Sequence, residues 1–351
     1  CRYRGMRACG AWPGDAIRTV FAPLQALAEP GPAGQPPVLR IQNTLAGAYG
    51  TVAGIDSAKD PGVAAQTLAA QVISGQSTDA LLGLRVQAAS LPRPISDVMR
   101  ELYSSIWSAL LQLAAAQLQS VWARDVDSVC QQTIAGRYPF ASLDAASGAP
   151  DVALADFAAF FGRGGVMDKF VTTNLALFTQ PGASGDLVLA TDDGISLNIS
   201  RTALDQINRA RRIRNLFFGT DGNPSLRFFV QPAYLDPRAT TATLTFDKTA
   251  IRNRHDPPVT TQVQWPSLDS SGAASFSLVT VGGQTPEIVT AGPWAMFRLL
   301  AQAERVPGAP GEQTVTFTLA GLRSSWTLRG GSVLSPLTNP NVLGFRCVPR
   351  L

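Results

Sequence analysis

The single histidine, His255, is the first residue to test for catalytic or metal-binding chemistry. A Ser-His or Cys-His nucleophile pair would have to use it, because the nucleophile of such a pair needs an adjacent base. No Gly-x-Ser-x-Gly pattern accompanies it. Zinc sites usually draw on histidine and cysteine together, and one histidine with four scattered cysteines is a poor supply of ligands. We therefore expect His255 to be a loop residue, and we predict no catalytic residue and no metal site.

Nucleotide-binding motifs are missing from the sequence as well. The P-loop pattern Gly-x-x-x-x-Gly-Lys-Ser/Thr does not occur. The dinucleotide pattern Gly-x-Gly-x-x-Gly fails where it comes nearest, in the stretch from Gly162 to Gly165, because Met167 stands where the last glycine belongs. We therefore predict no cofactor.

Paired carboxylates are the remaining catalytic candidates, because a glycosidase needs two carboxyl groups on opposite sides of a cleft. Three pairs are close in the sequence, namely Asp192 and Asp193, Asp125 and Asp127, and Asp151 and Asp156. The first pair is typical of a turn, and the second lies on a predicted helix at positions that do not face one another. We expect a protein that is not an enzyme. A hydrolase stays the alternative, since the sequence does not tell whether two such groups line a cleft.

The cysteines are too sparse for a disulfide scaffold, and no Cys-x-x-Cys pair exists. Cys1 and Cys9 are close enough in the sequence to be bridged in an oxidising compartment. Free cysteine is commonly buried as a small hydrophobic side chain. We therefore expect Cys130 to be buried on a helix and Cys347 to pack under a terminal strand.

One charge cluster lies on a predicted helix, Thr202 to Phe218. Its arginines are Arg201, Arg209, Arg211, Arg212 and Arg214. At about 100° per residue the apolar side chains fall on one side of this helix and Arg201, Arg209 and Arg212 on the other. This pattern predicts a solvated face, with a docking site for an acidic partner as the alternative. Arg214 projects among the apolar positions and needs a carboxylate or carbonyl partner if it is buried.

Composition and charge bound the class of protein. With 351 residues, 45% of them hydrophobic and 15% charged, the chain can bury a large core and is long enough for two domains. The 29 basic and 25 acidic residues leave a net charge of only +4. Nucleic-acid binders concentrate positive charge on one face, so we expect no nucleic-acid partner. No run reaches the roughly 18 to 20 apolar residues of a membrane-spanning helix, and the nearest, residues 109–121, is interrupted by glutamine and serine.

The first half of the chain has the period of helices. From Ser96 the apolar residues step by three or four towards Ile134, which predicts one long helix. Stretches rich in proline and glycine separate the predicted helices, because proline lacks an amide donor. The other predicted helices are 16–27, 39–55, 63–74, 78–89 and 152–161. An all-helical bundle domain over residues 1–178 follows from these elements.

The period changes at the turn-rich stretch 180–185. Asp-Gly at 193–194, between two apolar runs, is a hairpin signal. The predicted strands are 187–190, 195–199, 226–230, 241–246, 259–265, 274–281, 315–319 and 322–329. Two helices interrupt them, Thr202 to Phe218 and Pro293 to Ala303, and we expect Trp294 and Phe297 on the second to be core residues. The fold class is thus α+β, with a helical bundle domain followed by a β-sandwich-like domain over residues 179–351.

Four blocks of the chain resemble the TssM/IcmF family of the type VI secretion membrane core. They are Trp122 to Phe140, Leu154 to Phe170, the helix after Ala291, and the end of the chain with Asn339-Pro340 and Leu343 to Leu351. The ending Phe345-Arg346-Cys347 is similar to the Phe-Arg-Cys-Pro on which the family typically closes, interrupted here by Val348. The blocks keep the family's order and cover most of residues 120–351.

The resemblance implies the periplasmic part of an inner-membrane protein. The membrane anchors and the cytoplasmic portion of the family would lie upstream, so we expect a portion of a longer protein. The implied partners are the outer-membrane lipoprotein of the same apparatus, which is TssJ-like, and further copies of the chain, together building a trans-envelope channel. In that compartment the alternative hydrolase would be one that cleaves the cell wall.

Partner recognition is expected on loops of the β-domain. The strand faces that carry Phe317 and Trp326 are taken up by the core, and the opposite faces carry short threonine and serine side chains with little apolar anchor. The richest connection consists of Arg252, Asn253, Arg254, His255 and Asp256. The second candidate consists of Tyr234, Leu235 and Asp236. Solvated turns without a partner are the alternative for both.

Overall fold

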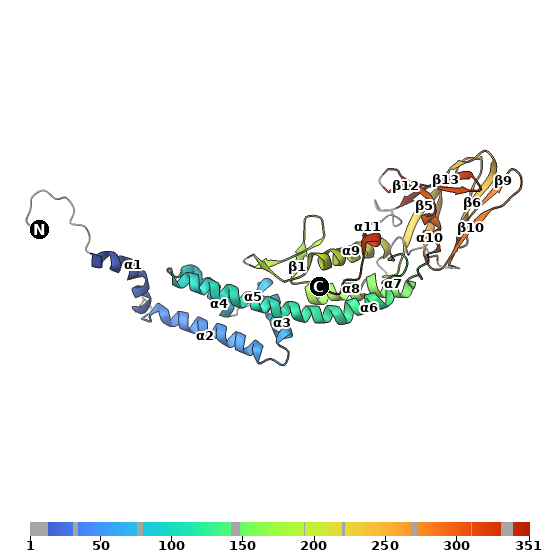
Figure 1. The fold of residues 1–351 in the computed structure, drawn as a ribbon. Coiled ribbons are helices and arrows are strands. Elements are labelled where there is room, and N and C mark those ends of the chain that lie inside the picture. Colours follow the sequence, from blue (N-terminus) through green and yellow to red (C-terminus); the bar gives the residue numbers. More distant parts are fainter. Residues whose placement is uncertain are drawn as a thin grey trace, which may run out of the picture. The chain divides into compact units, whose positions relative to one another are not determined.

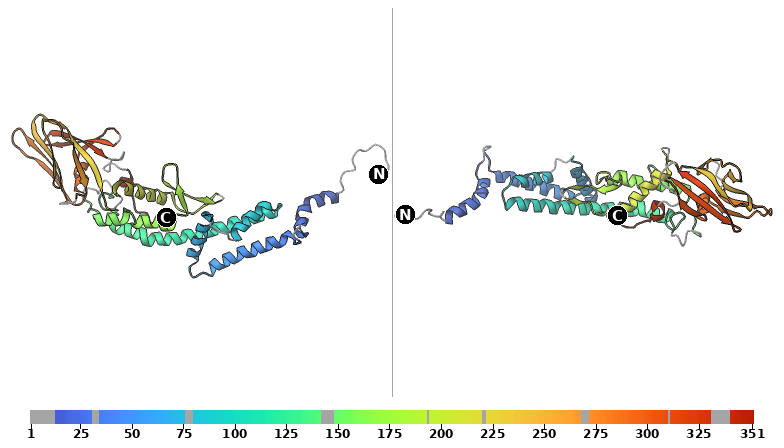
Figure 2. Two further views of the ribbon diagram at one scale, coloured as in Figure 1. Left: turned by 180° about the vertical axis from the view of Figure 1, so that it is seen from behind. Right: turned by 90° about the horizontal axis from the view of Figure 1, so that it is seen from above.

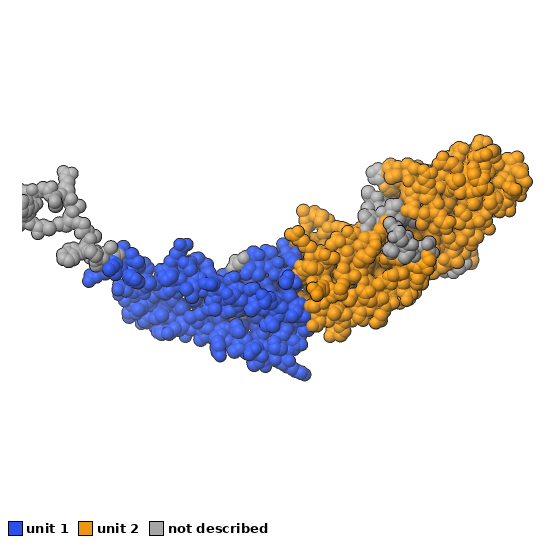
Figure 3. Space-filling view, in the orientation of Figure 1, with its two compact units in different colours: residues 1–117, 177–180, 189–198 blue, residues 118–176, 181–188, 199–351 orange. Residues whose placement is uncertain are grey.

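The structure is a computed structural model that describes residues 13–30, 34–75, 80–141, 148–192, 194–219, 222–267, 272–309, 311–330 and 340–351. Of the residues named above, Cys1, Cys9, Asp193 and Asn339 lie outside the described part, and so does the possible bridge between the first two. The chain divides into two compact units, coloured separately in Figure 3. The first comprises residues 1–117, 177–180 and 189–198, and the second comprises residues 118–176, 181–188 and 199–351.

The first unit is helical. Its helices are α1 (Pro13–Ala28), α2 (Pro37–Asp56), α3 (Pro61–Ile73), α4 (Ala80–Ser90) and most of α5 (Ile95–Val121), shown in Figure 1. Three of them begin at proline. Proline has no backbone N–H, and it suits the first turn because an N–H there would have no partner within the helix. The side chain of Asp60 caps α3 by accepting a hydrogen bond of 3.0 Å from the backbone amide of Val63. Among the described residues, no helix combines the length and the apolar character needed to cross a membrane.

A short hairpin packs on these helices at the predicted Asp-Gly turn, but its first arm is not the predicted strand 187–190, because Leu187–Leu189 pairs with another strand. Its strands are β3 (Thr191–Asp192) and β4 (Ile195–Ser196), which pair antiparallel. The carboxylate of Asp192 accepts hydrogen bonds from Arg85 at 2.5 Å and from the hydroxyl of Tyr103 at 2.6 Å. These two side chains lie on α4 and α5, so Asp192 holds the hairpin against both helices.

The predicted long helix is present but is not a regular α-helix throughout. After α5 the chain passes through a π-helical segment, η1 (Trp122–Asp127), into α6 (Ser128–Thr133). The residues at both junctions keep right-handed helical backbone angles, so the run from Ile95 to Thr133 is continuous.

The helices of the second unit surround a cluster of aromatic rings. They are η1, α6, α7 (Leu154–Phe161), α8 (Val166–Phe170), η2 (Val171–Leu175), α9 (Arg201–Phe217), α10 (Ala295–Ala301) and the short α11 (Pro340–Gly344). Phe157 and Phe161 of α7 pack with Phe140, and Phe157 also contacts Phe217 of α9 at 5.5 Å between ring centroids. The last helical segment before the strands ends at Leu175 and the first strand, β1 (Thr179–Pro181), pairs with β2 (Leu187–Leu189).

Two antiparallel sheets form the sandwich of the second unit, visible from two sides in Figure 2. One sheet has the order β10-β9-β6-β7 and the other β11-β12-β13-β5-β8. The strands are β5 (Leu226–Leu235), β6 (Ala239–Phe246), β7 (Thr249–Asn253), β8 (Thr261–Trp265), β9 (Ala273–Thr280), β10 (Glu287–Ala291), β11 (Glu304–Pro307), β12 (Glu312–Leu319) and β13 (Leu322–Gly330). Phe276 of β9 stacks on Phe317 of β12 at 4.4 Å, so the inward faces of the two sheets meet as alternation predicts.

The helix after β10 is shorter than predicted. α10 spans Ala295–Ala301 rather than reaching from Pro293 to Ala303, with Trp294 at its N-cap position. It lies against β9 and β10. Trp294 and Phe297 are 1% and 4% exposed, which confirms their place in the core. The described part of the strand-rich region therefore holds three helices, α9, α10 and α11, and the third was not predicted because five residues are too few to show a period.

Candidate functional site

The structure brings the two predicted partner-binding stretches together at one end of the sandwich. The side chain of Asn253, at the end of β7, donates hydrogen bonds to the carbonyl oxygen of Tyr234 at 2.7 Å and to the hydroxyl of Ser324 at 3.1 Å. Asn253 is only 3% exposed and Leu235 only 6%. Asn253 therefore joins β7 to β5 and β13, Leu235 belongs to the core, and the surface of this end is made by their neighbours.

Tyr234 and Leu235 lie in a strand, which corrects the prediction that they belong to a connection. β5 continues to Leu235 because it pairs with β13, with Leu235 opposite Ser324 and Tyr234 opposite Ser325. The register shifts between Ser325 and Trp326, and Pro232 lies at this irregularity. A proline and a bulge interrupt the alternation of apolar and polar residues, so the sequence pattern does not show that the strand continues.

Asp236 is bound within the turn that follows β5. Its carboxylate accepts hydrogen bonds from the backbone amide of Arg238 at 3.0 Å and from its guanidinium at 3.0 and 3.1 Å. These bonds to the ionised form lower the pKa of Asp236 from 3.8 to about 2. The negative charge of Asp236 is thus already paired inside this turn.

Arg252 and Asn253 lie in β7, which corrects the prediction that they belong to a connection, and Arg254, His255 and Asp256 follow the strand. Arg252, Arg254, His255 and Asp256 are exposed, and Tyr234 is 49% exposed on β5 of the other sheet. His255 has its Nε2 atom 2.8 Å from the carbonyl oxygen of Ala239, so the imidazole is tied to β6. The partner-binding role of this group stays a prediction.

Three of the five arginines of α9 are paired with carboxylates of the same unit. Arg214 forms an ion pair with Asp168, which supplies the partner that its position among apolar residues demands. Arg209 binds Asp205 at 2.7 Å. Arg212 binds Asp186 and also donates to Asn341 at 3.1 Å. The positive charge of this helix is therefore largely neutralised by its neighbours, which argues against docking of an acidic partner there.

Of the acidic residues considered as catalytic pairs, Asp125, Asp151 and Asp192 form ion pairs with arginine. Asp151 binds Arg298 of α10 at 2.6 Å, and the guanidinium of Arg298 lies 4.1 Å above the ring of Tyr138. Burial raises the pKa of Tyr138 to about 12. Asp125 binds Arg124 at 2.7 Å, and Asp192 holds the hairpin described above.

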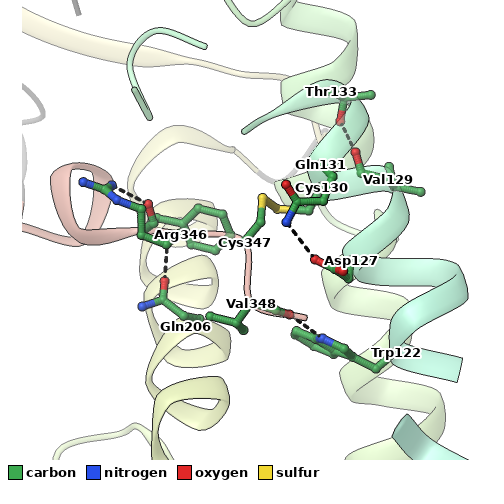
Figure 4. The surroundings of a disulfide bond; sticks show 11 residues. Trp122, Asp127, Val129, Cys130, Gln131, Thr133, Gln206, Arg346, Cys347 and Val348 are labelled. Carbon is green, nitrogen blue, oxygen red and sulfur yellow. Dashed lines mark hydrogen bonds between the residues drawn. A yellow bond between two sulfur atoms is a disulfide. The ribbon is translucent and has the colours of Figure 1, made fainter. Parts of the chain in front are cut away.

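A disulfide joins Cys130 of α6 to Cys347, which corrects the expectation of two free thiols (Figure 4). Their Cα atoms are 5.7 Å apart, although the two residues are 217 positions apart in the sequence. The end of the chain forms no terminal strand. After α11 it runs in extended form against the helices and brings Cys347 to Cys130, a contact that sequence spacing does not reveal.

Residues 340–351, here called the C-terminal strap, are held mainly through their backbone. Figure 4 shows Trp122 donating to the carbonyl oxygen of Val348 at 2.8 Å, and the backbone amide of Arg346 donating to Gln206 at 2.8 Å. The side chain of Gln119 binds the carbonyl oxygen of Pro349 and the amide of Leu351. Sequence reasoning missed these residues, and the only signal for them was the Phe-Arg-Cys ending.

The ring of Phe345 anchors the strap. It is 1% exposed and contacts Phe161 at 4.9 Å, Phe140 at 5.7 Å and Phe160 at 6.1 Å between ring centroids. The strap thus combines an aromatic anchor, backbone hydrogen bonds and a covalent bond.

Two family models match successive parts of the chain. The type VI secretion protein IcmF helical domain matches residues 113–223, and the type VI secretion protein IcmF C2-like domain matches residues 228–332. Together the two matches take in α6 to α9 and most of the sandwich.

One curated relative is the type VI secretion system component TssM1 of Pseudomonas aeruginosa. It is 29% identical over an alignment of 354 positions that covers 96% of this chain. The chain spans only 30% of the length of that relative.

Solved structures share the fold. A chain of a type VI secretion system membrane core complex matches 95% of this chain, with a TM-score of 0.77, 24% identity and 70% of its own length covered. The C-terminal domain of the type VI secretion protein TssM from EAEC matches 68% of this chain, with a TM-score of 0.58, 24% identity and 98% of its own length covered.

Proposed function

This chain belongs to the TssM/IcmF family of type VI secretion proteins, and we propose that it works as a structural component of the type VI secretion membrane complex. The observation that carries the proposal is the fold match over nearly the whole chain to a protein of such a complex. Two of the acidic residues first considered for catalysis, Asp151 and Asp192, hold elements together, which supports a scaffold role over the alternative of a cell-wall hydrolase.

We infer that the chain works on the periplasmic side of the inner membrane. The disulfide between Cys130 and Cys347 supports this location, because disulfides persist in oxidising compartments and are rare where thiols are kept reduced. The longer protein to which this part belongs would carry the membrane anchors that the family resemblance implies.

We further propose that the outer-membrane lipoprotein of the apparatus, a TssJ-like protein, binds the exposed end of the sandwich. Arg252, Arg254 and His255 are exposed there, and Tyr234, whose backbone carbonyl binds Asn253, is half-exposed. Aromatic and arginine side chains on a rigid scaffold are the usual anchors of protein interfaces. Contacts between copies of the chain would complete the trans-envelope channel.

A binding experiment with the lipoprotein of the same organism tests this proposal. The triple variant Arg252→Ala, Arg254→Ala, His255→Ala should weaken binding at least about tenfold, since two or three anchors of about 1 kcal/mol each are lost. A matched control, Arg227→Ala with Arg329→Ala, removes two exposed arginines at the end of β5 and β13 that is far from Tyr234.

The control should bind like the wild type, and circular dichroism should show both variants folded. Unchanged affinity in the triple variant would remove this end of the sandwich as the lipoprotein site. Failure of the folded wild type to bind the lipoprotein at all would refute the proposed partner.

A further inference from the structure

The C-terminal strap lies in a groove that would hold it without the disulfide. We call Gln119, Trp122, Cys130, Phe160 and Gln206 the strap groove. Gln119 donates to the carbonyl oxygen of Pro349 at 3.0 Å and accepts from the amide of Leu351 at 2.8 Å. Gln206 likewise accepts from the amide of Arg346 at 2.8 Å and donates to the carbonyl oxygen of Gly344 at 3.4 Å. Each glutamine amide therefore pairs with the strap as a neighbouring strand would.

The two sulfur-bearing residues differ in their access to solvent. Cys130 is 2% exposed and lies on α6 beneath the strap, whereas Cys347 is half-buried on the strap itself. The cavity beside the disulfide, lined by Trp122, Phe160 and Met167 among others, has a volume of about 10 Å³. Such a space takes no more than a water molecule, so no thiol reagent reaches Cys130 through it.

We propose that thiol–disulfide exchange at this disulfide takes place at Cys347 and not at Cys130. Exchange requires in-line access of a thiolate to one of the two sulfur atoms. Only the sulfur of Cys347 lies on the outer segment. In reduction an external dithiol–disulfide carrier attacks this sulfur, and in oxidation this sulfur attacks the carrier.

The steps balance in both directions. In reduction, an external thiolate attacks Sγ of Cys347, the bond to Cys130 breaks, and Sγ of Cys130 leaves as a thiolate that takes up a proton. A second thiol of the carrier then displaces Cys347, so the carrier is oxidised to a disulfide and both cysteines end as thiols. In oxidation, the thiolate of Cys347 attacks the carrier disulfide, and the thiolate of Cys130 then displaces the carrier while the strap is docked.

The reduced protein keeps the strap docked through the groove alone. The backbone hydrogen bonds of Gln119, Trp122 and Gln206 and the buried ring of Phe345 do not involve sulfur. Because the covalent bond is lost, the strap should open more often than in the oxidised protein. Reduction should therefore raise the rate of hydrogen exchange in residues 340–351 while leaving the sandwich protected.

The proposal is tested with single-cysteine proteins in a chain that carries Cys1→Ser and Cys9→Ser. Cys130→Ser leaves Cys347 as the only thiol, and Cys347→Ser leaves Cys130 as the only thiol. The probe is 5,5′-dithiobis(2-nitrobenzoate), which reports thiol reaction by colour. We expect Cys347 to react at least about tenfold faster than Cys130, because exposure of the thiolate governs the rate.

Two glutamine variants and one experiment on the oxidised protein test the same proposal separately. Gln119→Ala or Gln206→Ala, added to Cys347→Ser, should speed the reaction of Cys130 by loosening the strap. In the oxidised protein that keeps both cysteines, brief exposure to reduced glutathione should give a first mixed disulfide at Cys347, identified by peptide mass spectrometry. Equal rates in the two single-cysteine proteins, or a first adduct at Cys130, would overturn the proposal.

Discussion

Replacement of Trp294 by alanine should remove a large share of the stability of the second unit. Its ring lies 4.7 Å from that of Trp265 on β8, 5.2 Å from that of Phe157 on α7 and 5.3 Å from that of Phe297 on α10. Its indole nitrogen also donates a hydrogen bond of 2.8 Å to the carbonyl oxygen of Val152, a residue with no exposed surface. One side chain thus joins the helices of the unit to its sandwich.

The expected loss follows from these contacts. Truncating a buried Phe or Trp to alanine costs about 3 to 5 kcal/mol. Leaving the buried carbonyl of Val152 without a donor costs about 1 to 3 kcal/mol more, so Trp294→Ala should lower the free energy of unfolding by about 4 to 8 kcal/mol. Trp294→Phe keeps a ring in the cluster but loses the hydrogen bond and should cost about 1 to 3 kcal/mol.

Urea unfolding followed by circular dichroism at the helical minimum measures these differences. Val259→Ala is a suitable control, because Val259 is 71% exposed and its truncation should change the free energy of unfolding by less than about 0.5 kcal/mol. If Trp294→Ala unfolded at the urea concentration of the wild type and lost partner binding, Trp294 would be an exposed anchor, and the reasoning from burial would be refuted.

Three further measurements test other contacts of the second unit. Arg298→Ala should lower the free energy of unfolding by about 3 kcal/mol, because it strips a mostly buried Asp151 of its charged partner, and Arg298→Lys should restore part of the loss. The pKa of Asp236 is near 2 in the folded state and near 3.8 when unperturbed, so its carboxylate should stabilise the fold above pH 4 and lose this contribution as the pH falls towards 2; Asp236→Asn should flatten that part of the pH profile. Reductant should lower the free energy of unfolding of the wild type by about 2 to 5 kcal/mol and leave a protein with Cys347→Ser unchanged.

Each of these three measurements has an outcome that contradicts it. Equal stability of the alanine and lysine variants at position 298 would show that charge plays no part there. A wild-type pH profile that coincides with that of Asp236→Asn below pH 4 would mean that the turn is not held by the carboxylate. Sensitivity of Cys347→Ser to reductant would point to another reducible bond.

Elements with a strong period could be predicted from the sequence. The steps of three and four after Ser96 predicted the long helix, and the alternation around Phe317 and Trp326 predicted β12 and β13 with their tight turn. The need for a partner at Arg214 was also confirmed, because a buried guanidinium among apolar residues has few alternatives. In each case the burial of one face leaves a local pattern in the sequence.

Features without a buried face, or fixed only by the whole fold, could not be predicted. β10 (Glu287–Ala291) at the edge of its sheet is exposed or half-exposed at all positions, so its sequence lacks a clean alternation. β11 (Glu304–Pro307) is short and exposed for the same reason. The pairing of Cys130 with Cys347 depends on where the strap comes to lie, and no spacing rule covers 217 residues. The end of β5 was hidden by Pro232.

The disulfide also decides how the chain carries mechanical force. If tension acts between α5 and the residues that follow Cys347, the shortest covalent path runs along α6 and through the sulfur bond. The sandwich and α9 lie in a closed side loop that bears none of that load. This loop would reach about 700 to 800 Å if fully extended, at 3.3 to 3.6 Å for each of 217 residues, and force cannot extend it until the bond is reduced. An envelope component built in this way can be pulled from both ends while its sandwich stays folded.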